Sequence, residues 1–225
     1  EDLKKAFVGE PIADKRIQIE GDFDISDGQF VGQDLSFWLN GLHHFEGNIS
    51  FDKSEPLSQS LLNANVDRLY TDVLDLAQMS SKFKIPKELS RLETIDFSGS
   101  FDGFLNDFVA NGLLLSPLGK ANLDIKFDLS GVDSSAVSYN GFLSLDSFDL
   151  RKMTLNEDFG FVSAKVNIDN GVGSSLAASS ADIKAVIDQF EFKEFEYQDA
   201  VYEGKLSSRV IDGKFSIKDE ELDFN

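Results

Sequence analysis

Residues 95–129 read IDFSGSFDGFLNDFVANGLLLSPLGKANLDIKFDL, and this stretch decides the fold class. Apolar side chains alternate with polar or small ones in TIDFSGSFDGF (94–104) and again in ANLDIKFDL (121–129). Successive side chains of a strand point to opposite faces of a sheet, so each part predicts a strand with one apolar and one polar face. Asn106-Asp107 and the segment from Pro117 to Gly119 separate the alternating parts and predict tight turns.

The same alternation recurs along the whole chain. It is found in IQIEGDFDI (17–25), YNGFLSLDSFDL (139–150) and YEGKLSSRVIDGKFSI (202–217). Residues 11–53 fit a meander of strands, in which Asp27-Gly28 marks a turn because Gly tolerates positive φ. Further turns are expected at Asn156 to Gly160, Asn170-Gly171, Gln198-Asp199 and Asp212-Gly213.

Segment 54–93 breaks this alternation. Four residues after a short apolar run stand at helical spacing, namely Tyr70, Val73, Leu74 and Ala77. Asp72 and Asp75 suit the first turn of a helix, where negative charge is favoured, and Pro86 suits the start of a second short helix, PKELSRL (86–92). We therefore expect a small helical insert at about 68–93, packed against one edge or end of the sheet.

Glycine inside several strands predicts a sheet that curves, because Gly permits strong twist and bending. These glycines are Gly21, Gly47, Gly99, Gly112, Gly141 and Gly204. About 14 strands spaced ~4.8 Å apart would extend the sheet over roughly 65 Å. The expected fold is all-β, with residues 1–225 forming a single elongated antiparallel sheet that curves along its whole length.

Composition narrows the class of partner. The chain has 21 Phe against one Trp and four Tyr. Because the Phe ring carries no polar group, these many rings need apolar surroundings. The formal net charge of −19 argues against nucleic-acid binding and against docking on an anionic lipid surface. There are no cysteines, so disulfides and Cys-ligated metals are excluded.

Candidate catalytic and metal motifs are weak. His43 and His44 are adjacent, and on a strand they would face opposite ways, which disfavours a shared metal ion. DFDISDG (22–28) has the wrong Asp spacing for a calcium loop, and Gln33 stands where a bidentate Glu is needed. A Ser–His–Asp triad would have to use one of these two histidines, and no nucleophile elbow or phosphate-binding loop is present. We expect no enzymatic activity and no cofactor, although 40 acidic residues leave a glycosidase-like carboxylate pair open.

Residues 95–129, 139–171 and 190–225 resemble the TamB/AsmA-like translocation-and-assembly-module superfamily of Gram-negative bacteria. The resemblance implies a β-taco, a long sheet folded around a hydrophobic groove. It also implies a periplasmic bridge segment for phospholipid transport between inner and outer membranes, or for outer-membrane assembly. Phospholipid acyl chains are the implied partners, with outer-membrane assembly proteins as a further class. The family's anchor helix and C-terminal domain are not in this chain, so membrane contact would come from other regions.

The alternation supplies the residues expected to line the groove. They are Ile17, Ile19, Phe23, Ile25, Phe37, Ile49, Phe51, Ile95, Phe97, Leu123, Ile125, Phe127, Leu143, Leu145, Phe215 and Ile217. The chain begins without Met and stops at LDFN within a strand pattern, so we expect an internal segment of a longer, inner-membrane-anchored protein. Strand edges at both ends would then favour an artificial edge-to-edge dimer of the isolated piece.

A closed β-sandwich explains the alternation equally well, because its inward faces are also apolar. The alternative function is therefore that of a structural or adhesive repeat of an exported surface protein, which binds a protein or a glycan.

Overall fold

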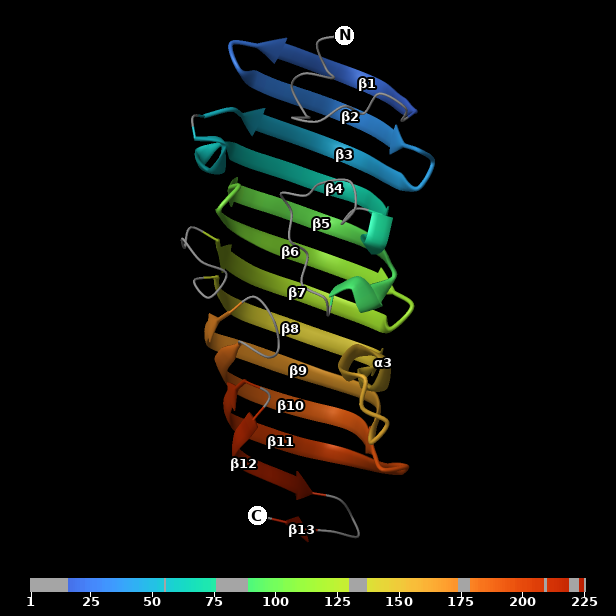
Figure 1. Cartoon of the computed structure of the whole chain (residues 1–225), viewed down its shortest axis with the longest axis vertical. Coiled ribbons are helices and arrows are strands. Elements are labelled where there is room, and N and C mark those ends of the chain that lie inside the picture. The colour runs from blue at the N-terminus through green and yellow to red at the C-terminus, as the bar shows by residue number, and fades with distance from the viewer. Residues whose placement is uncertain are drawn as a thin grey trace.

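The structure is a computed structural model and describes residues 16–54, 56–75, 89–129, 137–173, 179–208, 210–218 and 223–224. The strands of this part form one antiparallel sheet, whose order in space is the order in sequence (Figure 1). They are β1 (Ile17–Ser26), β2 (Gln29–Leu39), β3 (His43–Asp52), β4 (Leu61–Asp72), β5 (Thr94–Phe104), β6 (Asp107–Ser116), β7 (Gly119–Asp128), β8 (Ser138–Asp149), β9 (Phe159–Val172), β10 (Ser180–Phe192), β11 (Phe195–Ser207), β12 (Val210–Lys218) and β13 (Asp223–Phe224).

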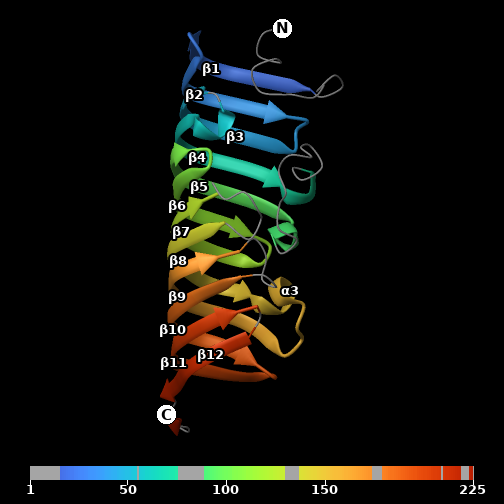
Figure 2. The same ribbon diagram turned by 60° about the vertical axis from the view of Figure 1, so that its left-hand side comes forward.

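The predicted fold class is confirmed. The sheet is elongated and open, since within the described residues each strand pairs only with its neighbours in sequence, and β1 and β13 lie at opposite ends. Figure 2 shows the sheet in profile, curved about its long axis. The sheet has 13 strands, one of them only two residues long, against the expected number of about 14. A second sheet, as a sandwich requires, is not present among the described residues.

Cross-strand pairing aligns apolar side chains into rows that run along the sheet. Residues directly opposite on neighbouring strands share a face, so the register shows which side chains lie together. One row, here called the long apolar row, passes from β1 to β12 without a polar residue. Its members are Ile19, Phe37, Phe45, Leu69, Phe97, Leu114, Ala121, Leu145, Ala164, Ile187, Ala200 and Ile217. The face that carries this row is the apolar face, and the other is the polar face.

Three bulges keep this alternation in phase. Asp34, Ser147 and Asn170 have φ between 49° and 53°, and each stands where the register shifts by a residue. The backbone N–H of each bulged residue donates to a side chain on the neighbouring strand, and these N–H to oxygen distances are 2.8–3.1 Å. The accepting side chains are Asn48, Ser163 and Asn140, respectively. The side chains therefore satisfy donors that the disrupted ladder leaves unpaired.

Two glycines stand where β5 and β6 approach each other too closely for a side chain. Gly99 and Gly112 lie opposite each other on β5 and β6, with φ of 154° and 156°. A Cβ on Gly99 would stand 2.0 Å from the carbonyl oxygen of Asn111, and a Cβ on Gly112 would stand 2.2 Å from that of Ser98. Any side chain at either position would therefore force β5 and β6 apart.

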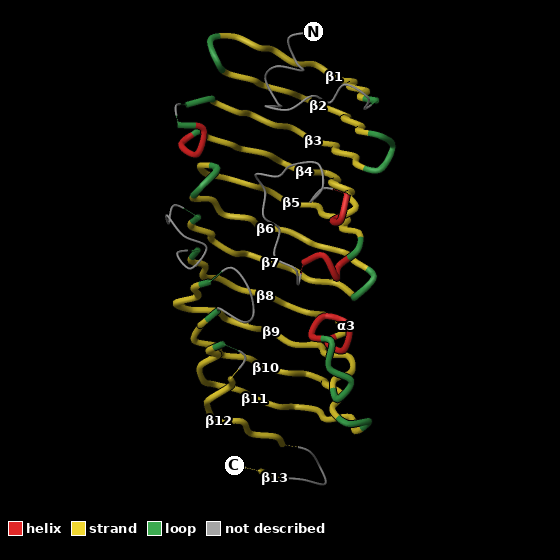
Figure 3. The backbone as a smooth tube through the Cα atoms, viewed as in Figure 1, coloured by secondary structure: helices red, strands yellow, loops and turns green. Residues whose placement is uncertain are grey.

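Short helices lie at the ends of strands (Figure 3). They are η1 (Leu57–Gln59), η2 (Leu89–Leu92) and α3 (Leu150–Thr154). Asp149 caps α3, since its carboxylate accepts a hydrogen bond from the backbone N–H of Lys152 at 3.0 Å. Leu150 and Met153 of α3 pack with Leu92 of η2 on a core cluster of the apolar face. Arg91 of η2 donates to the carbonyl of Met153, which fastens the two helices together.

The predicted helical insert is partly wrong. Tyr70 belongs to β4, which continues to Asp72, because its pairing with β5 extends the strand beyond the point where helical spacing begins. Residues 73–75 are helical, and the Asp72 carboxylate accepts from the Asp75 N–H at 2.8 Å as an N-cap does. The expected helix start at Pro86 and the position of Ala77 lie outside the described residues. Residues 89–92 form η2, a single 3₁₀ turn.

Several predicted turns are confirmed, namely Asp27-Gly28, Asn106-Asp107, Pro117 to Gly119, and the connection before Phe159. Three are wrong. Asn170-Gly171 forms the bulge in β9, Gln198-Asp199 lies inside β11, and Asp212-Gly213 lies inside β12. Gly213 instead faces Gly204, where a Cβ would stand 2.5 Å from the Glu203 carbonyl oxygen. The β10–β11 turn is made by Lys193 and Glu194, both with positive φ.

Candidate functional site

All sixteen residues predicted to line a groove lie on the apolar face. Five belong to the long apolar row, and the register places the others in parallel rows beside it. One such parallel row is also apolar from β1 to β12. It consists of Phe23, Gly32, Ile49, Ala64, Phe101, Ala110, Ile125, Gly141, Ile168, Ile183, Gly204 and Gly213.

Exposure along the apolar face changes from the ends of the sheet to its middle. Of the sixteen predicted residues, Phe97 and Ile217 are buried, at 4% and 7% exposed. Phe23 is 47% exposed, Ile25 49% and Phe215 41%, and the remaining residues are half-buried. Large apolar side chains near both ends of the sheet are therefore accessible to a ligand or a neighbouring chain.

Sequence reasoning missed several aromatic residues of this face. Phe101 and Phe108 connect the predicted Phe97 and Phe127 into a chain of rings, with centroid separations of 5.0, 6.4 and 5.4 Å. Toward the other end of the sheet, the ring of Phe190 stacks on that of Tyr197, with 4.9 Å between the ring centroids. The signal for Phe101 was available, since it continues the alternation of residues 94–104.

Two core clusters divide the apolar face. One gathers Ala64, Val66 and Phe97 with half-buried neighbours from β3 to β7. The other includes Phe148 and Val162, and α3, η2 and the turn at Val73 pack over it. The helices thus cover the face at one end of the strands (Figures 2 and 3). Helix α3 was not predicted, although an N-capping Asp149 before Leu150 and Met153, three residues apart, is a short helical signal.

The two histidines lie on opposite faces, as predicted. His43, on the apolar face, lies 2.7 Å through Nδ1 from the Thr71 hydroxyl and 2.7 Å through Nε2 from the Asp75 carboxylate. These contacts tie β3 and β4 to the helical turn that follows β4. Hydroxyl, imidazole and carboxylate follow one another here as they do in a catalytic triad. However, Thr71 is buried, with only 6% of its surface exposed. We therefore interpret this trio as a structural link.

His44 belongs to the polar face. Its ring stacks on Trp38 with 3.5 Å between centroids, and its Nε2 lies 3.1 Å from a carboxylate oxygen of Glu46. The DFDISDG segment is also polar-face and turn structure, since Asp22 and Asp24 are exposed on β1 and Asp27 begins the hairpin to β2. No cluster of three potential metal ligands occurs among the described residues.

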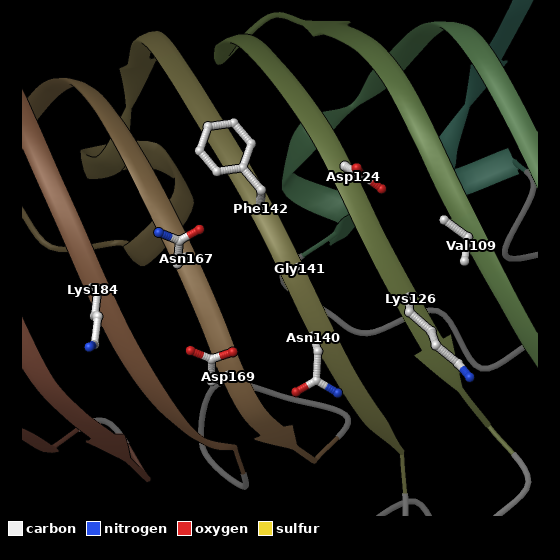
Figure 4. A pocket seen from close by; sticks show the side chains of 9 residues that line it. All are labelled: Val109, Asp124, Lys126, Asn140, Gly141, Phe142, Asn167, Asp169 and Lys184. Atoms are coloured by element: carbon white, nitrogen blue, oxygen red, sulfur yellow. The ribbon is translucent and has the colours of Figure 1, made fainter.

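A hollow of about 550 Å³ lies on the polar face across β6 to β10 (Figure 4). Its lining includes Phe142, Asp124, Asn167, Lys126 and Lys184. Lys184 Nζ lies 3.0 Å from a carboxylate oxygen of Glu203, and this hydrogen bond is the main reason that the pKa of Lys184 is raised. This hollow cannot be recognised from local sequence, because its residues come from five strands and are brought together only by the register of the sheet.

The fold and this face define an open, elongated antiparallel sheet with a continuous apolar face. Comparisons of the chain with protein-family models, with curated proteins and with solved structures gave no match. In the described part of the chain, no helix has the length and apolar character needed to cross a bilayer.

Proposed function

We propose that the chain is a non-catalytic segment of a periplasmic bridge protein, whose apolar face carries phospholipid acyl chains between inner and outer membranes or serves outer-membrane assembly. One observation carries the proposal: apolar rows run from β1 to β12 on a face that no second sheet of the described residues covers. The resemblance to TamB/AsmA-like proteins supports the same function. Membrane attachment and assembly partners would come from regions beyond this chain.

The energetics of a lipid tail favour a continuous apolar surface. Each buried CH₂ gains ~0.8 kcal/mol, so a tail of about 16 carbons gains on the order of 12 kcal/mol relative to water. A polar gap of a few CH₂ lengths would therefore add several kcal/mol to the barrier for movement. The row through Phe23, Ile49, Phe101 and Ile125 has no polar side chain. It is the more accessible route, because α3 and η2 cover the ends of β8 and β9 around Phe148 and Val162.

Phe23→Asp tests this function. Phe23 is 47% exposed on the apolar face, so its replacement should cost less than about 1 kcal/mol of folding stability. A carboxylate beside an acyl chain is costly, so phospholipid that co-purifies with the protein should fall severalfold. Native mass spectrometry and exchange of a fluorescent acyl lipid measure the loading.

Phe161→Asp is the matched control, because Phe161 is 48% exposed but lies on the polar face. It should load lipid as the unmodified chain does. A chain that takes up no phospholipid in any variant would refute the proposal, and so would equal losses in both variants. Phe97→Asp does not serve here, because Phe97 is buried in a core cluster and its replacement should unfold the sheet.

A further inference from the structure

The hollow on the polar face is assembled from five neighbouring strands. Val109 comes from β6, Asp124 and Lys126 from β7, Phe142 from β8, Asn167 and Asp169 from β9, and Lys184 from β10. Figure 4 shows these side chains on the same side of the sheet. Its volume of about 550 Å³ falls within the range of roughly 300–1,000 Å³ found for small-molecule sites.

Both lysines of the hollow are already paired with carboxylates outside its lining. Lys126 Nζ lies 3.1 Å from a carboxylate oxygen of Asp107, and Lys184 Nζ lies 3.0 Å from one of Glu203. Asp124 and Asp169 add two negative charges to the lining. An anionic ligand would therefore gain little net attraction there, whereas a neutral ligand would meet both hydrogen-bond donors and acceptors.

Polar side chains of the hollow have unused hydrogen-bonding capacity. Asp124, Asn167 and Asp169 form no side-chain hydrogen bond to another described residue. Asn140 uses its oxygen for the bulge N–H of Asn170, which leaves its amide N–H groups free to donate. A ligand rich in hydroxyl groups could therefore bind without displacing contacts that hold the fold.

An aromatic ring stands among these groups. Phe142 is 36% exposed, and the register places Asp124 and Asn167 directly on its two sides. The face of an aromatic ring carries negative charge density and attracts weakly positive C–H groups. The hollow therefore offers one apolar platform with hydrogen-bonding groups on both flanks.

We propose that this hollow binds a neutral oligosaccharide. The C–H face of one sugar ring would rest on Phe142, and its hydroxyl groups would bond to Asp124 and Asn167. Asn140 and Lys126 would meet the neighbouring sugar along the strand direction. This site lies on the face opposite to the proposed lipid surface, so the two functions are independent.

The test uses the full chain and three tetrasaccharides of equal length. Cellotetraose and chitotetraose are the neutral probes, and tetragalacturonate is the anionic one. Titration calorimetry and NMR shifts of the Asn167 side-chain amide report binding. We expect saturable binding of a neutral probe, weakened about fivefold or more by Phe142→Ala and also weakened by Asn167→Ala.

Phe161→Ala is the control, since it removes an exposed ring from the same face outside the hollow. It should bind sugar like the unmodified chain, and Phe142→Ala should keep both its circular dichroism spectrum and its lipid loading. No binding of either neutral probe at about 10 mM would overturn the proposal. Equal losses in the two Phe variants, or tighter binding of tetragalacturonate, would also overturn it.

Discussion

Close contact with the backbone of β5 limits which residue position 112 can hold. Gly112 adopts φ 156° and faces Gly99, and a Cβ there would lie 2.2 Å from the Ser98 carbonyl oxygen. Gly112→Ala combines an unfavourable φ with this clash, so we expect a loss of about 2–3 kcal/mol in the free energy of unfolding. Urea denaturation measures the loss.

Gly41→Ala separates the two causes of that loss. Gly41 also has positive φ, 70°, but a Cβ on it would meet nothing within 4 Å. It should therefore cost only about 1 kcal/mol, from backbone strain alone. Equal losses for the two variants would show that the clash does not matter.

The bulged residues show how far single side chains control register. Asp34 and Asn170 adopt positive φ inside strands, and each N–H finds a side-chain acceptor opposite. Without such an offset, every apolar residue beyond the bulge would turn to the polar face, because the side-chain period of a strand is two. The apolar rows therefore depend on polar residues that are not part of them.

At the scale of elements, α3 depends on its cap more than on its length. Five residues form too short a helix to be stable alone, so capping and packing must hold it. Asp149→Ala removes the acceptor for the Lys152 N–H and should cost about 1 kcal/mol of stability. Thermal or urea unfolding of the full chain checks this value.

Asp149→Asn provides the comparison, because it keeps an oxygen acceptor and removes the charge. It should retain most of the stability, since Asn caps helices about as well as Asp. If Asn destabilised as much as Ala, the 3.8 Å pairing between Asp149 and the Lys152 ammonium would be the main contribution instead of the cap.

Alternation predicted the strands well, because the period-two pattern and the apolar face have the same physical cause. The groove candidates Phe23, Ile125 and Ile217 accordingly share a face. Turns were less predictable. Asp212-Gly213 has turn chemistry but serves close strand approach, and Lys193-Glu194 makes a turn without Gly. Residue type signals what φ a position tolerates, but not whether the chain reverses there.

The polar-face hollow could not be predicted for a different reason. Its residues come from β6 to β10, and their proximity depends on register across four strand pairs, including the bulge at Asn170. A one-residue error in any of these pairings would place the residues contributed by its two strands on opposite faces. Local sequence therefore indicates the two faces, whereas a site that spans several strands requires the whole register.

At the scale of the whole molecule, the sheet behaves as a one-dimensional array. Each strand pairs with its sequence neighbours, and the core clusters draw on β3 to β10 rather than on the two ends. In such arrays, stability is a sum of local and nearest-neighbour contributions, so opening can start at an end without unfolding the middle. An open sheet therefore predicts unequal stability along its axis, whereas a closed sandwich predicts nearly uniform stability.

Hydrogen exchange of the full chain distinguishes these cases. Backbone amides of β5 to β9 should exchange slowest, because these strands lie in the middle of the sheet and carry Phe97, Phe148 and Val162 of the two cores. Amides of β1 and β12 should exchange at least about tenfold faster, since both strands lie toward the ends of the array and expose much of their side-chain surface. Uniform protection from β1 to β12, lost in a single cooperative step with urea, would mean that the ends are held as firmly as the middle.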